Sequence, residues 1–350
     1  MARFTHMIST VDAHTAGEPV RLVLSGLPPV LGKTMVEKKH YVRNHLDHFR
    51  TLLMQEPRGH ADMFGAILTA PCNEAAQYGV LFMDNGGYLD MCGHSIMGVT
   101  TALIEIGMVP AQEPETTLVF ETPAGLITSR ARVEEHCVTE VSIVNVPAFL
   151  YAENVEIEIP SFGRVVCDVA FGGNFFATLP VKSLGLSLSA DHIPALIRLG
   201  IEIKRAINAR LAIRHPLHEH MDTVELTEFY ERPDPSIPFA KNLVVFGAGQ
   251  CDRCPCGTGT SATLAALYAK GELSLDTEFV TESIIGTRFK GRLTRTIELG
   301  GFMAVEPIIT GTAYLMGMHQ FWVDPQDPVK FGFKVHEQVG SMGCGESGLR

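Results

Sequence analysis

Three cysteines lie within six residues of the segment CDRCPCGTGTSA, which begins at Cys251. Thiols at this spacing could hold a metal ion, form a disulfide or take part in acid–base catalysis. A second segment, CGHSIMGVTTALIEIG from Cys92, resembles CGTGTSATLAALYAKG from Cys256. Both begin with Cys-Gly, and both carry a glycine fifteen residues after the cysteine. Either this short similarity arose by chance, or the chain has two related halves, each with a Cys-Gly turn before a buried helix.

A cysteine at the start of a helix has a specific chemistry. The N-terminus of a helix carries unpaired N–H groups and a partial positive charge, which stabilise a thiolate and bind a carboxylate. Two such ends that face each other, at Cys92 and Cys256, could remove a proton from one face of a carbon and return one to the other. We therefore expect both thiols to have pKa values below the usual one. Asp90 would raise the pKa of Cys92 if its carboxylate faced the site.

A zinc site is the main alternative from another class of protein. Cys251, Cys254 and Cys256 form a C-x2-C-x-C pattern, and HPLHEH (215–220) or Cys344 could supply a fourth ligand. However, a helical pattern starts directly after Cys256, and the proline before it suits a helix entry better than a zinc knuckle. A binding protein whose fold is stabilised by a structural zinc ion is therefore the less favoured interpretation, and we expect no bound metal.

The segments around these motifs predict many short strands and few helices. TLVFETPAGLITSRARV (117–133) alternates around a turn and predicts a hairpin. The segment 95–107 is apolar on nearly all sides, which predicts a buried helix. Further helices are predicted at 35–54, 192–211 and 261–271.

Composition excludes several classes of partner. The chain has 350 residues, 46% of them hydrophobic, and a formal net charge of −11. Its basic residues form no stripe, so we expect neither nucleic acid nor a membrane as partner. No apolar run suggests an export signal or a membrane span, which favours a cytoplasmic protein with reduced thiols. GTGTSA lacks the Gly-Lys-Ser/Thr of a P-loop, and no other cofactor fingerprint is present.

The cysteine motifs resemble those of the proline racemase family. MDNGGYLDMCGHS (83–95) is similar to the first motif of the family, and DRCPCGTGTSA (252–262) to the second, which usually has Ser where this chain has Cys254. The similarity covers nearly the whole chain. It includes DAHTAGEPVR (12–21), EPRGHADMFG (56–65), NVPAFLY (145–151), FGGNFFA (171–177) and AKGEL (269–273).

The resemblance implies a cofactor-independent racemase or epimerase with an α/β (α+β) fold of the diaminopimelate-epimerase type. Two pseudo-symmetric lobes, each a curved mixed sheet around a central helix, would close over the substrate. We expect the first lobe, with Cys92, at 1–130 and 325–350, and the second, with Cys256, at 131–324. The resemblance also suggests a homodimer.

By position in the family motifs, Cys92 and Cys256 would be the two catalytic bases. The ring nitrogen of the substrate would be held by Asp252 and His94. The substrate carboxylate would be bound by backbone groups of Gly93, His94, Gly257 and Thr258.

The substrate is predicted from the expected walls of the pocket. In proline racemases two phenylalanines press on the unsubstituted ring, and these correspond to Phe64 and Phe246. A hydroxyl group against such walls would lose its water without gaining a partner, at a cost of about 1–3 kcal/mol. We therefore expect proline racemisation, with 4-hydroxyproline 2-epimerisation as the alternative. The 3-hydroxyproline dehydratases replace one catalytic cysteine with Ser or Thr, and both cysteines are present here.

Overall fold

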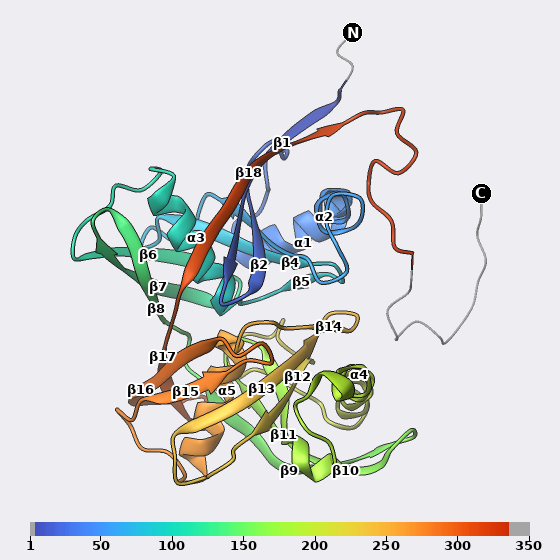
Figure 1. Cartoon of the computed structure of the whole chain (residues 1–350), viewed down its shortest axis with the longest axis vertical. Coiled ribbons are helices and arrows are strands. Elements are labelled where there is room, and N and C mark those ends of the chain that lie inside the picture. Colours follow the sequence, from blue (N-terminus) through green and yellow to red (C-terminus); the bar gives the residue numbers. More distant parts are fainter. Residues whose placement is uncertain (1–3, 336–350) are drawn as a thin grey trace.

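The computed structural model describes residues 4–335 of the chain, which form two lobes stacked one above the other (Figure 1). The first lobe contains β1 (His6–Thr15), β2 (Glu18–Ser25), α1 (Met35–His45), α2 (Asp47–Met54), β3 (Phe64–Thr69), β4 (Tyr78–Asp84), β5 (Tyr88–Leu89), α3 (Gly93–Glu105), β6 (Glu115–Thr122), β7 (Gly125–Glu134), β8 (Cys137–Val144) and β18 (Ala313–Val323). The second contains β9 (Phe149–Ile159), β10 (Gly163–Phe171), β11 (Phe175–Pro180), η1 (Val181–Leu184), η2 (Ala190–His192), α4 (Ile193–Arg210), β12 (Val224–Glu231), β13 (Phe239–Phe246), β14 (Gln250–Cys251), α5 (Gly257–Ala269), β15 (Phe279–Glu282), β16 (Arg288–Leu299) and β17 (Phe302–Gly311).

The two lobes have the same strand order and the same strand directions. In the first lobe the strands pair in the order β18-β1-β2-β3-β4-β6-β7-β8. In the second the order is β9-β10-β11-β12-β13-β15-β16-β17. In each lobe the third and fifth pairings are parallel and the others antiparallel. β8 and β17 pair antiparallel and join the two sheets. The predicted organisation in two related halves is therefore confirmed for the whole strand order.

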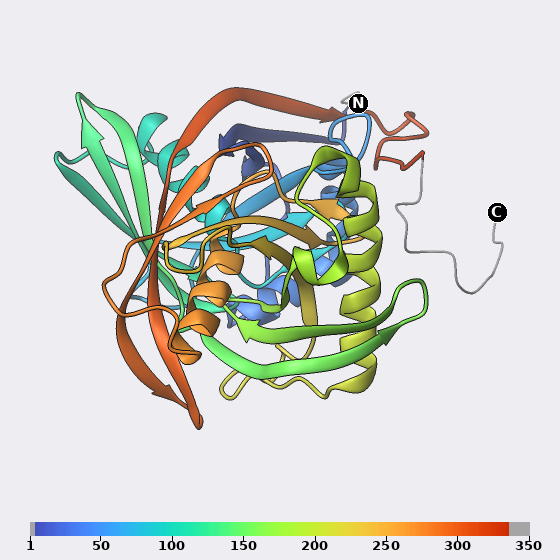
Figure 2. The same cartoon turned by 60° about the horizontal axis from the view of Figure 1, so that its bottom comes forward.

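Each sheet curves around one apolar helix. Residues 93–104 of α3 and 257–267 of α5 are all buried. α3 packs on strands from β1 to β8 and on β18, and α5 on strands from β9 to β17. A helix that is apolar on all sides is stable only when protein surrounds it. In Figure 2 α5 lies against the curved strands of its lobe while α4 covers an outer face.

The expected residue ranges of the lobes differ from the strand pairing. The predicted boundary near residue 130 lies inside β7, and β18 pairs with β1 well before the expected return at 325. The strand pairing instead indicates that the chain passes from the first lobe to the second at 145–148 and returns to the first at 312. These ranges stay a prediction, and residues 336–350 of the expected first-lobe tail lie outside the described part of the chain.

The predicted secondary structure differs from the observed one mainly at one helix. The hairpin at 117–133 is confirmed as β6 and β7. The single helix expected at 35–54 is wrong, because α1 ends at His45 and α2 begins at Asp47. Asp favours the first turn of a helix, which gives the chain a second start at this point. Within residues 4–335, no helix is long and apolar enough to cross a membrane.

Candidate active site

The N-termini of α3 and α5 meet at the junction of the lobes. Cys92 is the N-cap residue of α3 and Cys256 that of α5. A Cβ atom added to Gly93 would lie 3.0 Å from the Cα of Gly257, and one added to Gly257 would lie 3.1 Å from the Cα of Gly93. The N-termini of the two helices therefore lie in contact, and only glycine allows two backbones to approach this closely. The first-turn N–H groups of both helices have no intrahelical acceptor.

One small cavity lies between these helix starts. It has a volume of about 20 Å³, which is room for about one water molecule. Its lining includes every residue predicted for the site: Phe64, Cys92, Gly93, His94, Phe246, Asp252, Cys256, Gly257 and Thr258. Leu89, Met91 and Leu226 also line it and were not predicted. They are isolated apolar residues in a chain rich in them, so the sequence offers no signal for them.

The Cys92 thiol lies next to an imidazole. Its Sγ is 3.0 Å from Nδ1 of His94. Burial lowers the pKa of His94 to about 3, so the imidazole is neutral. The hydroxyl of Thr15 donates to the carbonyl of His94 at 2.7 Å and fixes the first turn of α3. Asp90 does not face this thiol, because its carboxylate contacts Lys39 and lies 3.6 Å from Nε2 of His220.

The Cys256 thiol has a different environment. Its Sγ accepts a hydrogen bond from the N–H of Gly259 at 3.4 Å and lies 3.6 Å from the hydroxyl of Thr258. The N–H of Cys256 donates to Sγ of Cys254 at 3.3 Å. Cys256 has φ +58°, a left-handed conformation that is strained for a residue with a side chain. Such strain is typical of functional sites and here directs the sulfur toward the first turn of α5.

Three buried acids surround the site, of which only Asp252 was predicted. Burial raises the pKa of Asp252 to about 6 and that of Glu228 to about 7. Burial, and then the charge of Asp252, raise the pKa of Glu18 well above its usual value. Glu18 accepts from the N–H of Arg253 at 2.7 Å, while its other oxygen is buried without a hydrogen bond. The acids come from separate strands and loops, so spacing along the sequence could not bring them together.

The thiols are less acidic than expected from their helix positions. Burial raises the pKa values of Cys92 and Cys256 well above the usual value, and the charge of Asp252 raises both further. Hydrogen bonds from the backbone N–H of Ser95 to Cys92, and from Thr258 and Gly259 to Cys256, lower the two pKa values but do not outweigh burial. The expected lowering is therefore wrong for this closed site, because the loss of water outweighs the helix N-terminus.

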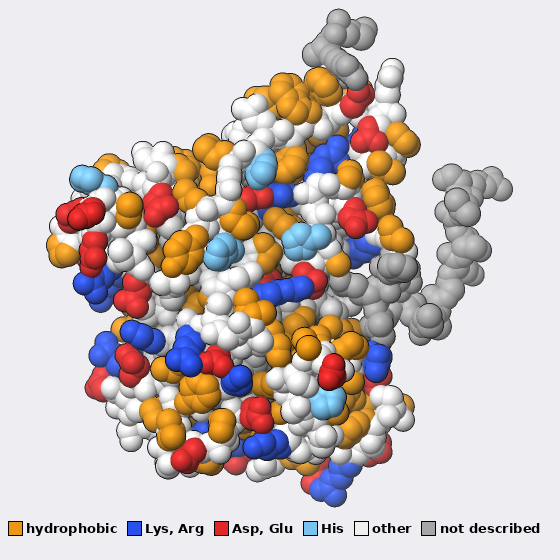
Figure 3. Space-filling view, in the orientation of Figure 1, with side chains coloured by type: hydrophobic (Ala, Val, Ile, Leu, Met, Phe, Trp, Pro, Cys, Tyr) orange, Lys and Arg blue, Asp and Glu red, His pale blue; other side chains and the backbone are white. Residues whose placement is uncertain are grey.

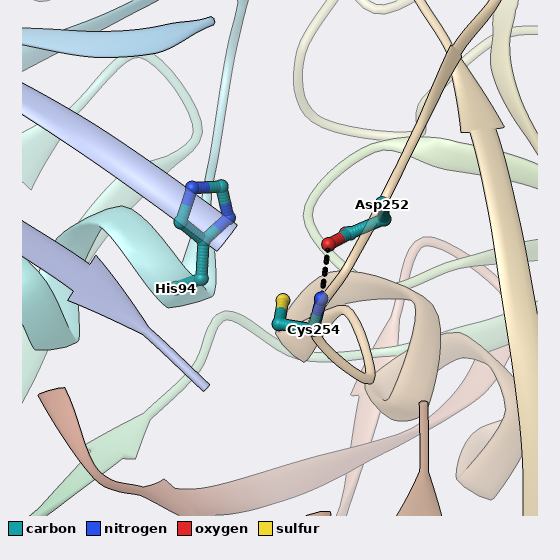
Figure 4. A group of neighbouring side chains, drawn as sticks. All are labelled: His94, Asp252 and Cys254. Carbon is teal, nitrogen blue, oxygen red and sulfur yellow. Dashed lines mark hydrogen bonds between the residues drawn. The ribbon is translucent and has the colours of Figure 1, made fainter. Parts of the chain in front are cut away.

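The cysteines proposed as zinc ligands do not converge. Within residues 4–335, the group of ligand atoms close enough to hold a metal ion comes from His94, Asp252 and Cys254 (Figure 4). Neither Cys251 nor Cys256 belongs to it. His215 and His218 line a separate cavity. Cys344 lies outside the described residues.

The walls of the cavity are apolar on the side of the two phenylalanines. The rings of Phe64 and Phe246 are 6.2 Å apart, edge to face, and Phe64 also packs edge to face on His94 at 4.7 Å. Both phenylalanines are buried, and Leu226 also lines the cavity. On this side the site therefore presents hydrocarbon to a ligand, with two thiols and two helix N-termini beside it.

Comparison with known proteins shows the family of this chain. The family model described as proline racemase matches residues 10–334. A proline racemase of Acetoanaerobium sticklandii is 49% identical over 334 residues, which are 95% of this chain and 100% of that protein. A 4-hydroxyproline 2-epimerase of Streptosporangium roseum is 43% identical over 95% of this chain and 99% of its own length.

The fold also matches a solved structure. A hydroxyproline epimerase from Agrobacterium vitis, with bound trans-4-hydroxy-L-proline, superposes with a TM-score of 0.91 at 31% identity, and covers 97% of this chain and 99% of its own. The expected fold class is therefore confirmed. With a family model that spans almost all described residues, and with relatives similar over their full lengths, this chain belongs to the proline racemase family.

Proposed function

We propose that the protein interconverts L-proline and D-proline without a cofactor, with Cys92 and Cys256 as the two acid–base groups. The observation that carries this proposal is the contact between the N-termini of α3 and α5, with a buried cysteine at the N-cap of each helix. One thiolate removes the Cα proton from one face, and the opposite thiol donates a proton to the other face. The reverse reaction exchanges the two roles.

The substrate carboxylate binds between the two helix N-termini. Backbone N–H groups of Gly93, His94, Gly257 and Thr258 are first-turn donors of α3 and α5. As the Cα proton leaves, negative charge spreads onto the carboxylate, so these fixed donors stabilise the transition state more than the ground state. Such donors are typically worth about 3–4 kcal/mol each in activation free energy.

The ring nitrogen binds in its protonated form between Asp252 and His94. Both side chains are buried and line the cavity with the two cysteines. The free site contains several acids and thiols whose charged forms are disfavoured by burial. A bound cation reverses this effect, because it favours the carboxylate of Asp252 and one thiolate. Substrate binding therefore supplies the charge that activates the catalytic base.

Proline fits the apolar walls better than 4-hydroxyproline. A ring hydroxyl against Phe64, Phe246 or Leu226 would be desolvated without a partner there, which costs about 1–3 kcal/mol. This corresponds to a preference for proline of roughly 5- to 150-fold in kcat/KM. The alternative function, 4-hydroxyproline 2-epimerisation, requires a polar group facing carbon 4 of the ring.

Polarimetry with both substrates tests the proposal. The purified protein should convert L-proline to the racemate, and act on trans-4-hydroxy-L-proline with a lower kcat/KM. Cys92→Ser and Cys256→Ser should each lose racemisation by several orders of magnitude, whereas Cys251→Ser, which changes a neighbouring thiol outside the cavity lining, should stay active. No activity with proline, or retained activity in either catalytic variant, would overturn the proposal.

We also propose a homodimer in a reducing compartment such as the cytoplasm. β18 pairs with β1 alone among the described strands, and its outward side chains Tyr314, Met316, Met318 and Trp322 are 58%, 55%, 68% and 48% exposed. Figure 3 shows hydrophobic side chains at the end of the molecule where β1 and β18 lie. An apolar row on an edge strand favours pairing with a second copy. Light scattering should give a molar mass of twice that of one chain. The variant Met318→Arg places a charge in the apolar row and should reduce the measured mass to that of a single chain.

A further inference from the structure

Three metal-binding side chains from both lobes converge beside the active-site cavity. His94 comes from the first turn of α3, whereas Asp252 and Cys254 come from the loop before α5 (Figure 4). One ligand atom of each lies within 4.8 Å of the other two, and all three residues are buried. We propose that this group binds one Zn²⁺ ion, which holds the lobes closed and excludes substrate.

The donor set selects zinc over the hard cations. An imidazole nitrogen, a thiolate and a carboxylate oxygen are ligands that Zn²⁺ accepts together, whereas Mg²⁺ and Ca²⁺ prefer oxygen alone. In a tetrahedral zinc site the ligand atoms lie about 3.3–3.7 Å apart. Side-chain rotations that move atoms by about 1 Å therefore complete the site. The Cys254 thiol loses its proton to the solvent as the sulfur–zinc bond forms.

The surroundings of the group favour a cation. With the carboxylate of Asp252 and the thiolate of Cys254, a Zn²⁺ ion gives a neutral centre, which is the least costly state in a buried site. Glu18 lies near Asp252, and one of its carboxyl oxygens is buried without a hydrogen bond. The backbone N–H of Cys254 already donates to Oδ1 of Asp252 at 2.9 Å, which fixes the two lobe-two ligands relative to each other.

The ion would lie beside the cavity and use two of the side chains proposed to hold the substrate nitrogen. His94 and Asp252 are the residues proposed to hold that nitrogen, and the cavity between them has room for about one water molecule. A water molecule bound in this cavity next to the ion can serve as the fourth ligand. Metal and substrate then compete for the same side chains. The binding of the ion is independent of the proposed function, whereas the inhibition rests on it.

Cobalt titration of the metal-free full-length protein tests the binding. Co²⁺ replaces Zn²⁺ in tetrahedral sites and shows a thiolate-to-cobalt charge-transfer band that zinc lacks. The wild type and Cys251→Ser should show this band at one ion per chain, and added Zn²⁺ should remove it. Cys254→Ser should lose the band and bind Zn²⁺ roughly 100-fold more weakly by calorimetry. Asp252→Asn should weaken Zn²⁺ binding as well. A band that survives in Cys254→Ser but disappears in Cys256→Ser would overturn the proposal, as would no binding at all.

Kinetics then test the inhibition separately. Zn²⁺ should raise the KM for proline without lowering kcat, and a chelator should restore the original rate. If the zinc-free protein does not turn over proline, the proposed function fails while the cobalt titration still decides the metal site. Zinc binding that leaves the KM for proline unchanged would contradict the proposal that the ion and the substrate use the same side chains.

Discussion

The two thiols proposed as acid–base groups differ in the strand residues that lie near them. Phe64 in β3 and Leu226 in β12 both line the cavity, and two residues further along each strand stand Ala66 and Glu228. Glu228 is buried, accepts from Nδ2 of Asn242 at 2.7 Å and from the hydroxyl of Thr263 at 2.8 Å, and raises the pKa of Cys256 through its charge. The first lobe has Ala66 at the corresponding place, and the acid besides Asp252 whose charge raises the pKa of Cys92 is instead Glu18 in β2. The buried acid near each thiol therefore comes from a different strand of its lobe, which the pseudo-symmetry of the fold does not predict.

Glu228 should make the stability of the protein depend on pH. Burial raises the pKa of its carboxyl to about 7, while in the unfolded chain it titrates near the ordinary value of about 4.3. The folded state thus binds more protons between these values, so stability falls as pH rises through this window and the loss is complete above it. The full difference in the free energy of unfolding is on the order of 4 kcal/mol.

The variant Glu228→Gln isolates this contribution. Its amide oxygen can accept from Asn242 and its NH₂ group can donate to the hydroxyl of Thr263, so both contacts are kept. In urea unfolding, the variant should be more stable than the wild type at pH 8.5 and should lose the advantage at pH 4.5. An equal difference at both pH values would contradict a buried, titrating carboxyl.

Asp252 should set the acid side of the activity profile. Burial raises its pKa to about 6, so the carboxyl becomes neutral as pH falls through this value. A neutral Asp252 cannot pair with the protonated ring nitrogen of the substrate. We expect kcat/KM for proline to fall about tenfold per pH unit below this value, measured at constant ionic strength. A flat profile from pH 8 to pH 5 would argue against this role.

At the scale of the element, the two buried helices determine where the cysteines lie. Each of α3 and α5 is surrounded by the strands of its own sheet, and the two helices touch at Gly93 and Gly257. Because each helix is surrounded by its own sheet, neither can shift without moving a lobe. The spacing between the backbones of Cys92 and Cys256 is therefore fixed by the packing of the two helices.

Gly93→Ala should disturb this spacing. The new methyl group would lie 3.0 Å from the Cα of Gly257, so the helix starts must separate by a few tenths of an ångström. We expect kcat/KM to fall by about 10- to 100-fold while circular dichroism is unchanged. Gly87→Ala is the matched control, because no atom lies within 4 Å of its added Cβ. Equal activity of the two variants would refute the argument from close packing.

At the scale of the whole molecule, the structure is a closed form. Its cavity of about 20 Å³ holds about one water molecule, which is too little for an amino acid, and Cys92 and Cys256 are 5% and 6% exposed. Substrate must therefore enter when the lobes separate. The connections at 145–148 and 312 join the lobes and are the places where such a motion would bend the chain.

Alkylation of cysteines should report this motion. Iodoacetamide reaches Cys92 and Cys256 only in an open form, whereas Cys72 and Cys137 are exposed in the closed one. A planar five-membered ring carboxylate, which mimics the flattened Cα, should slow modification of Cys92 and Cys256 by the same factor. Peptide mass spectrometry of the same sample provides the control, since the rates at Cys72 and Cys137 should not change. Protection of only one catalytic cysteine would contradict joint closure.

The sequence predicted the parts of the site that repeat. The shared Cys-Gly and the later glycine pointed to Cys92 and Cys256, and an apolar composition on nearly all sides predicted the buried helix that follows Cys92. Glu18 and Glu228 could not be found in this way, because each is a single acid in a strand and becomes significant only through tertiary contacts. The reversed direction of the thiol pKa shifts was also beyond the sequence, since it depends on how completely the lobes exclude water.

Initial-rate labelling in D₂O tests most directly whether one thiolate removes the Cα proton of the substrate and the opposite thiol donates a new one. With L-proline as substrate, the D-proline formed should carry deuterium at Cα, because the opposite thiol has exchanged with the solvent. The remaining L-proline should stay unlabelled at early times, because the thiolate that takes its proton does not return one from solvent. Deuterium that appears in L-proline as fast as in D-proline, or D-proline that keeps the original hydrogen, would show a single base and contradict the account.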